Sequence, residues 1–199
     1  MTRSEEIRLI ARVKRGHADA FRDLVEAYQQ RLSAFIWRMV RNYHETEDLC
    51  QAAFVKAYES LDSYSSNYAF STWLFTIAYR LCLNSLRKKK AVSGETDFSY
   101  VGDGEDDVSL SLANSEEAQR LRDLIWDAVD QLTPPQKSAV LLFYREGKSC
   151  QEIGVVLGIP AVTVKSHLHR GREKLRQLLN AELVEDWLAV RYLGDSSGA

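Results

Sequence analysis

The sequence predicts an all-α protein made of two helical domains joined by a flexible acidic linker. Apolar residues recur at intervals of three and four over most of the chain, which is the period of an amphipathic helix. The alternating pattern typical of strands is not found in the sequence. Between the two helical blocks, residues 91–115 are polar, acidic and glycine-containing, and they lack a helical period. This composition is typical of a flexible linker.

Charge is distributed unevenly along the 199 residues, whose formal net charge is −2. Residues 1–90 carry 15 basic and 10 acidic side chains, and residues 91–115 carry 6 acidic and no basic ones. Residues 116–180 carry 10 basic and 8 acidic side chains, and residues 181–199 carry 1 and 4. Two mildly basic blocks separated by an acidic strip favour two separate contacts with nucleic acid over one basic domain.

The three cysteines, Cys50, Cys82 and Cys150, lie far apart, each within an apolar helical pattern. An odd and scattered set argues against a disulfide framework and against a zinc site. We interpret them as buried free thiols in a reducing compartment. Residues 1–15 lack the apolar core of a signal peptide, and no run of about 18 apolar residues occurs. We therefore expect a cytoplasmic protein without membrane insertion.

The spacing of apolar residues in the first block, residues 1–90, predicts several helices. They are expected over residues 5–42 with a break near Gly16, over residues 45–61, and over residues 70–90. A polar loop, DSYSSN, precedes the last helix, which begins aromatic and ends in four basic residues. Aromatic rings beside a basic track suit unstacked single-stranded bases, although several of the rings, Phe75 above all, are equally expected in a core.

The second block, residues 116–180, predicts a compact domain of four helices. Two helices are expected over 116–131 and 134–146, with Thr133 as the cap of the second. Ser149 and Glu152 then have the spacing of a capping box at the start of a short helix. Gly158 stands where a helix needs a left-handed stop, and a last helix follows over about 160–179. The last two helices, joined by a tight turn at Gly158, indicate a helix-turn-helix motif.

The exposed face of the last helix suits duplex DNA. Val164, Leu168, Leu175 and Leu178 mark its buried face by their spacing. Small polar residues toward the helix start suit base edges, and basic residues further on suit phosphates. The residues expected to contact DNA are Thr163, Lys165, Ser166, His169 and Arg170. Many surface helices are basic, so these features alone leave a plain helical bundle as an alternative.

Three stretches, in this order, resemble bacterial sigma factors of the extracytoplasmic-function (ECF) group, group 4 of the sigma-70 family. DLCQAAF at 48–54 is similar to the stretch that grips the polymerase clamp helices, with Ala52 in place of the usual acidic residue. FSTWLFTIAYRLCLNSLRKKK at 70–90 resembles the element that opens −10 promoter DNA, and residues 132–176 resemble the −35-binding domain. The resemblance covers the chain from about Ala18 to Leu179.

The resemblance implies a non-enzymatic transcription initiation subunit that needs no cofactor. It would bind core RNA polymerase through Asp48, Gln51 and Phe54, read −35 DNA as duplex with residues 116–180, and melt −10 DNA with residues 1–90. The residues implied at −10 are Trp73, Tyr79, Arg80, Asn84, Arg87 and Lys88. Its partners would be core RNA polymerase, promoter DNA, and an anti-sigma factor or other regulator.

Some positions depart from the family pattern. Arg80 and Asn84 stand where family members often carry Asn and Asp, which bears on the −10 sequence preference. Gly171 stands mid-helix where Ala is usual, at a cost of about 1 kcal/mol in helix propensity. Residues 181–199 extend beyond the family core, and we expect a short amphipathic helix stopped by Gly194 and then disorder.

Two other classes of protein are the alternatives. A helix-turn-helix regulator would bind a palindrome as a dimer without polymerase, with a sensor or dimerisation domain in the first block. The DLCQAAF and FSTW stretches discriminate against it, because a repressor needs neither. An enzyme with an all-α catalytic domain is disfavoured, because the sequence shows no metal-ligand cluster, no Gly-rich phosphate loop and no nucleophile beside a base.

Overall fold

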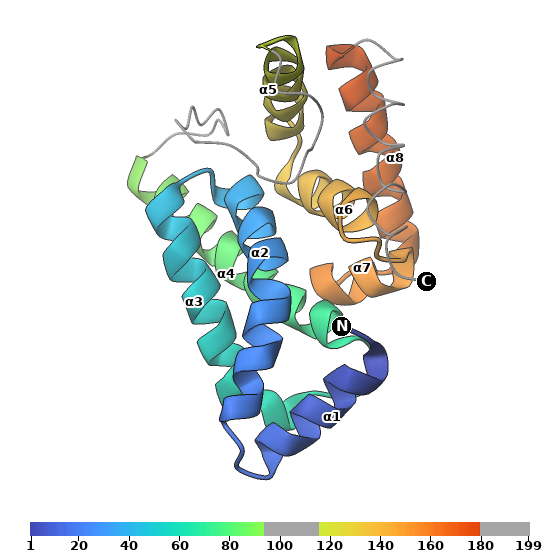
Figure 1. The fold of residues 1–199 in the computed structure, drawn as a ribbon. Helices are drawn as coiled ribbons and strands as arrows, with labels where there is room; N and C mark the ends of the chain where they lie inside the picture. The colour runs from blue at the N-terminus through green and yellow to red at the C-terminus, as the bar shows by residue number, and fades with distance from the viewer. Residues whose placement is uncertain (94–115, 180–199) are drawn as a thin grey trace. The chain divides into compact units, whose positions relative to one another are not determined.

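The computed structural model describes residues 1–93 and 116–179, and the chain divides into two compact helical units (Figure 1). The described residues form helices and no strands, so the predicted all-α fold class is confirmed. Most of the predicted linker over 91–115 lies outside the described residues. The predicted helix and disordered end over residues 181–199 lie outside them as well.

The first unit contains α1 (Arg3–Lys14), α2 (Asp19–Val40), α3 (Tyr43–Glu59), a short 3₁₀ helix η1 (Leu61–Ser63) and α4 (Phe70–Ser93). These are the predicted helices, although α4 runs three residues past the predicted end. The predicted break lies at Gly16, whose φ of 94° is left-handed. The side chain of Asn42 accepts a hydrogen bond of 2.9 Å from the Glu45 N–H and so begins α3.

The core of the first unit lies where α2, α3 and α4 pack against one another, with α1 packed on α2. Its largest fully buried side chains come from α2 and α4: Leu24, Leu32, Ile36, Phe70, Leu74 and Phe75. Burying each such side chain contributes about 1.5–3 kcal/mol. The packing therefore fixes one face of α4 and leaves another face of this helix to solvent.

The helices that follow the first unit along the chain, which we describe together as the second unit, are α5 (Glu116–Asp130), α6 (Pro134–Tyr144), α7 (Cys150–Leu157) and α8 (Ala161–Leu178). The predicted capping box at the start of α7 is confirmed. The Ser149 N–H donates to the Glu152 carboxylate at 3.0 Å, and the Glu152 N–H donates to Ser149 Oγ at 3.2 Å. Gly158 ends α7 with a φ of 69°, as its position predicts.

The packing of the second unit explains why α8 carries a glycine at position 171. Gly171 is buried where α6 and α8 pack together, and a Cβ added there would lie 3.1 Å from Cγ2 of Val140. The missing methyl group therefore lets the two helices approach closely. A Cβ at this position would require the Val140 side chain to move by a few tenths of an ångström.

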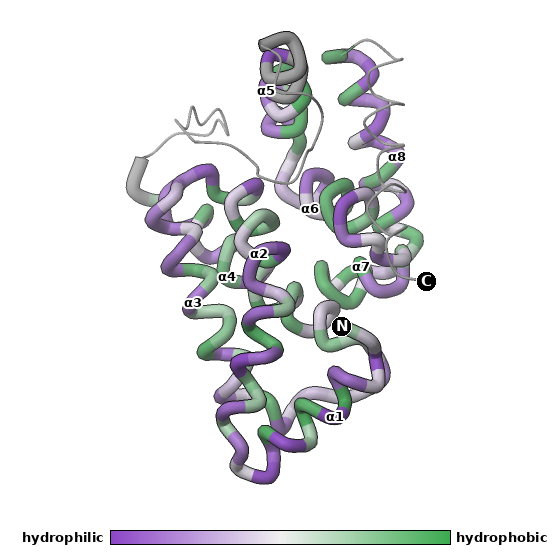
Figure 2. The backbone as a smooth tube through the Cα atoms, viewed as in Figure 1, coloured by the Kyte–Doolittle hydropathy of each residue, from purple (hydrophilic) through white to green (hydrophobic). Residues whose placement is uncertain are grey.

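Polar and apolar residues alternate along the helices in step with the helical turns (Figure 2). The purple and green segments of the tube follow each other about once per turn, as amphipathic helices require. Among the described residues, no helix combines the length and the apolar content that crossing a bilayer requires.

Candidate nucleic-acid interface

The helix α8 presents the predicted DNA-contacting residues on one side. Its buried face is formed by Val164, Leu168, Gly171 and Leu175. Of the five predicted contacts, Thr163 is half-buried, and the other four, Lys165, Ser166, His169 and Arg170, are exposed. Because residues four apart are neighbours on a helix, Lys165 lines up with His169 and Ser166 with Arg170. The arrangement leaves two ridges of polar and basic side chains free to enter a groove.

Val162 at the start of α8 was missed by the sequence reasoning. Its side chain is 70% exposed, the largest exposure among the exposed apolar residues of the described chain. An apolar side chain at this end of a recognition helix can contact the methyl group of thymine. An apolar residue at helical spacing is typical of a core, so only the structure sets it apart.

Two glycines fix how the chain passes from α7 to α8. A Cβ on Gly154 would lie 2.7 Å from the carbonyl oxygen of Ile159, so the backbone leaves no room for a side chain there. The Ile159 N–H donates to the Gly154 carbonyl at 3.0 Å. Gly158 has open space around it, and its left-handed φ is what favours glycine. Together they define the tight turn of the helix-turn-helix.

The arginines further along α8 differ in their surroundings. Arg176 forms an ion pair of 2.8 Å with Glu173, and Arg172 Nε donates to the Leu168 carbonyl at 3.4 Å. Lys174 is exposed on the same helix. Lys165, Arg170 and Lys174 are therefore better placed than Arg172 and Arg176 to reach phosphates.

The helix α4 carries a second exposed stripe of side chains. Arg80, Asn84, Arg87 and Lys88 are all exposed and recur at intervals of three to four residues. Trp73 is half-buried and precedes Arg80 by seven residues, which is close to two helical turns. An aromatic ring is thus followed by cationic and amide side chains along one side of the helix. With this order, the ring can stack on an unpaired base while the cationic side chains contact phosphates further along the same strand.

Tyr79 departs from the prediction. Its side chain is only 5% exposed and lies in the core of the first unit, so it is not presented to a base. Burial accordingly raises the pKa of Tyr79. An aromatic residue on an amphipathic helix suits both a core and a stacking surface, and Tyr79 lies in the core.

The loop before α4 brings further side chains to the aromatic end of this stripe. Residues 64–69 connect η1 to α4, and Ser65, Ser66, Asn67 and Tyr68 are exposed. The Trp73 ring lies 5.5 Å from that of Tyr64 and 5.7 Å from that of Phe70, measured between ring centroids. These buried rings pack against one side of the Trp73 ring, and part of the Trp73 side chain stays exposed to solvent.

The basic run at the end of α4 is partly tied to α3. Lys89 forms an ion pair with Glu45, and the hydroxyl of Ser85 donates to the same carboxylate. Glu45 thereby fixes the end of α4 against α3. Arg87 and Lys88 remain the exposed members of the run that were predicted to contact DNA.

The helix α3 carries the residues predicted to contact polymerase. Asp48 and Gln51 are exposed, whereas Phe54 is 8% exposed and packs edge-on against Phe21 with ring centroids 6.5 Å apart. Phe54 is therefore a core residue in this structure. The stripe begun by Asp48 and Gln51 continues with Val55 and Tyr58, which are 49% and 47% exposed and were not predicted.

Comparison with known proteins gives two family matches that cover most of the described residues. Residues 24–92 match the model of Sigma-70 region 2, and residues 122–175 match that of Sigma-70, region 4. The chain is 39% identical over 185 residues to the ECF RNA polymerase sigma factor SigW of Bacillus subtilis, covering 85% of this chain and 94% of the relative. It is 36% identical over 168 residues to the RNA polymerase sigma factor CarQ of Myxococcus xanthus, covering 84% and 94%.

Solved structures share the fold. The sigma factor RpoE of Bartonella quintana, in complex with the anti-sigma factor NepR, matches with a TM-score of 0.66 at 23% identity over 81% of this chain and 98% of that one. CnrH, in complex with the cytosolic domain of CnrY, matches with a TM-score of 0.66 at 21% identity over 89% and 99%.

Proposed function

The chain belongs to the RNA polymerase sigma factors of the sigma-70 family, within the ECF group, and from this membership we propose how its two units divide promoter recognition. The first unit binds core polymerase through α3 and opens −10 DNA with α4 and the loop before it. The second unit reads −35 DNA as duplex with α8. The protein acts as a non-enzymatic initiation subunit of group 4.

The observation that carries the proposal is the exposed stripe on α4. Trp73, Arg80, Asn84 and Arg87 follow one another along a helix whose opposite face is buried. Duplex DNA hides its base faces, so a half-exposed indole has a base to stack on only where strands separate. A helix-turn-helix regulator that binds intact duplex has no use for this surface, and the stripe lies within the residues that match region 2.

The polymerase contact is proposed for the exposed stripe of α3. Asp48, Gln51, Val55 and Tyr58 combine polar groups with an exposed valine and an exposed aromatic ring. Protein interfaces combine an apolar centre that is enriched in aromatic residues with a polar rim. The four residues have this composition on one side of one helix.

Partners and location follow from the family. One structural relative is in complex with the anti-sigma factor NepR, and another is in complex with the cytosolic domain of CnrY. We extend this to the present chain and propose an anti-sigma factor or similar regulator as a third partner beside polymerase and promoter DNA. The site of action is the cytoplasm, where polymerase works.

The two DNA contacts can be separated in one experiment on the reconstituted holoenzyme. Trp73→Ala should reduce permanganate reactivity of −10 thymines and leave −35 occupancy intact, because stacking on an unpaired base contributes about 1–3 kcal/mol. Lys165→Ala and Arg170→Ala should weaken promoter occupancy itself. Arg176→Ala, which removes the same charge from an arginine already paired with Glu173, is the control. Equal thymine reactivity in Trp73→Ala would exclude Trp73 from melting.

A further inference from the structure

A buried carboxylate in α1 joins three helices of the first unit. Glu6 is 4% exposed and accepts hydrogen bonds from the Tyr28 hydroxyl of α2 and, at 3.3 Å, from the Phe70 N–H that begins α4. It also pairs with Arg3 at 3.3 Å. A buried charge is tolerated when several donors satisfy it, and a helix N-terminus favours an anion. Glu6 therefore fixes the start of α4 from outside that helix.

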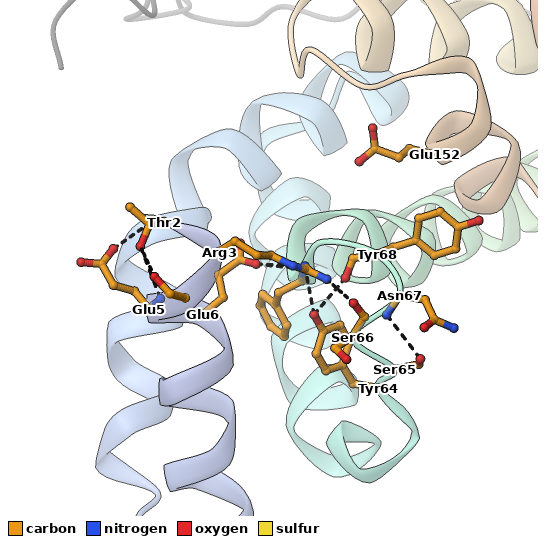
Figure 3. Close-up of polar contacts among 12 residues, drawn as sticks. Thr2, Arg3, Glu5, Glu6, Tyr64, Ser65, Ser66, Asn67, Tyr68 and Glu152 are labelled. Atoms are coloured by element: carbon orange, nitrogen blue, oxygen red, sulfur yellow. Dashed lines mark hydrogen bonds and ion pairs between the residues drawn. The ribbon is translucent and has the colours of Figure 1, made fainter. Parts of the chain in front are cut away.

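Arg3 extends this network to the loop that precedes α4. Figure 3 shows its guanidinium between Glu6 and the loop, where it donates to the Tyr64 hydroxyl at 3.2 Å and to the Ser66 carbonyl. The Tyr64 hydroxyl donates in turn to the Tyr68 carbonyl at 2.9 Å. Because the guanidinium is a rigid planar fork, one side chain fixes two points of the loop at once.

Outside this network, Tyr64 packs against the rings of Phe70 and Trp73, and within the tip of the loop the Asn67 N–H donates to Ser65 Oγ at 3.4 Å. Residues 64–69 belong to no helix, and the side chains at its tip, Ser65, Ser66 and Asn67, are exposed. Ordering such a backbone when a ligand binds costs conformational entropy at every residue that becomes fixed. A loop that is ordered beforehand avoids that cost and presents its polar groups in one geometry.

The helix that provides this support lies before the family match. The match to Sigma-70 region 2 begins at residue 24, whereas Arg3 and Glu6 lie in α1. The supported loop leads directly into the stripe that begins at Trp73. The N-terminal helix is thereby connected to the surface that opens DNA.

We propose that Arg3 and Glu6 are positioning residues for −10 recognition: they hold residues 64–69 in the conformation that contacts an unpaired base beside Trp73. The inference rests on the proposed role of α4 in opening −10 DNA. Arg3 and Glu6 themselves do not touch the DNA. Their effect is on how sharply the loop distinguishes one base from another.

The test uses the full-length chain with core polymerase, on a promoter selected from a randomised library by the wild-type holoenzyme. Transcription is measured on a set of templates, each with one base changed in the −10 or −35 element. Arg3→Lys keeps a positive charge for Glu6 but lacks the fork, and Arg3→Ala removes both. Arg8→Ala, at an exposed arginine of the same helix, is the control.

Arg3→Lys and Arg3→Ala should lose about tenfold of the base discrimination at one or two adjacent −10 positions, the size of one base contact. Discrimination at −35 and polymerase affinity should match the wild type, as should every property of Arg8→Ala. Discrimination unchanged in both Arg3 variants would overturn the inference. A loss spread evenly over −10 and −35 positions would also overturn it, because that pattern reports a weakened fold.

The outcome separates this inference from the proposed function. If the wild-type holoenzyme does not open the −10 region at all, the proposed function fails, and the inference falls with it. If the wild type opens DNA and discriminates normally while Arg3→Lys does the same, only the positioning role fails. Glu6→Gln, with its melting temperature measured, is the second variant and should show the same local loss.

Discussion

Single residues fix the geometry of both proposed DNA contacts, and they do so for different physical reasons. Gly154 is required because a side chain would collide with backbone, whereas Gly158 is required because of its left-handed φ. Glu6 and Arg3 act through hydrogen bonds that join segments more than 60 residues apart. Each of these residues contributes geometry to a surface that it does not itself form.

The two glycines should respond differently to substitution. Gly154→Ala should destabilise the second unit by about 1–3 kcal/mol, since the new methyl group meets the Ile159 carbonyl and the backbone must shift. Gly158→Asn should cost less, because asparagine tolerates the left-handed region. Urea denaturation followed by circular dichroism measures both. A Gly154→Ala protein more stable than the parent, as helix propensity alone would give, would contradict the close contact.

Buried neutral groups in the first unit predict a loss of stability in alkali. Burial raises the pKa of the Cys82 thiol to about 12, from an ordinary value of 9.0. Burial and the hydrogen bond to Glu6 raise the pKa of Tyr28 above its usual 10.0. Folding thus favours the protonated forms, so their contribution is complete below pH 9 and is lost as pH rises toward 12.

The melting temperature of the first unit, measured from pH 8 to 11, should therefore fall above about pH 9–10. Cys82→Ala should show a shallower fall than the parent, even though the cavity lowers its stability at pH 8. The same slope in both proteins would mean that Cys82 ionises as freely in the folded chain as in the unfolded one.

At the scale of helices, the sequence predicts where helices lie along the chain better than it predicts which side chains face solvent. The periodicity, the capping box at Ser149 and the turn at Gly158 predicted the helices of the described residues to within a few positions. Which side chains face out was harder, because aliphatic and aromatic residues at helical spacing suit a core and a surface alike. Phe54 and Tyr79 are buried, while Val55, Tyr58 and Val162 are exposed.

The contacts of Arg3 and Glu6 could not be predicted from the sequence for a second reason, which is the distance along the chain between the partners. Arg3 lies 61 positions from Tyr64, and Glu6 lies 64 positions from Phe70. No local pattern connects such residues, and neither belongs to a motif. Only the fold of α1 against the rest of the first unit brings them together.

The exposed stripe of α3 gives a prediction at this scale. Val55→Asp should weaken binding to core polymerase without unfolding the chain, because Val55 is half exposed and a charge in an apolar interface centre is disfavoured. Binding is measured by competition for core polymerase with a labelled sigma factor. Ile7→Asp, at an apolar residue of α1 with 45% exposure, is the matched control. Equal affinities in the two variants would remove α3 from the interface.

For the whole molecule, we propose that the two helical units on one chain make two independent DNA contacts. The matches to Sigma-70 regions 2 and 4 assign each unit to a different part of the family. In this proposal, the protein reads two short DNA elements whose separation is set by polymerase. Neither unit alone would then specify a promoter.

The central claim is that both units act together within a polymerase holoenzyme, and one measurement tests it most directly. A randomised promoter library is transcribed by core polymerase with and without the protein, and the start sites are sequenced. We predict that the protein directs initiation at sites that share a −35 block and a −10 block at fixed spacing, with reactive thymines in the −10 block alone. The account would be contradicted if the protein added no initiation to that of core polymerase and instead protected a palindrome by itself.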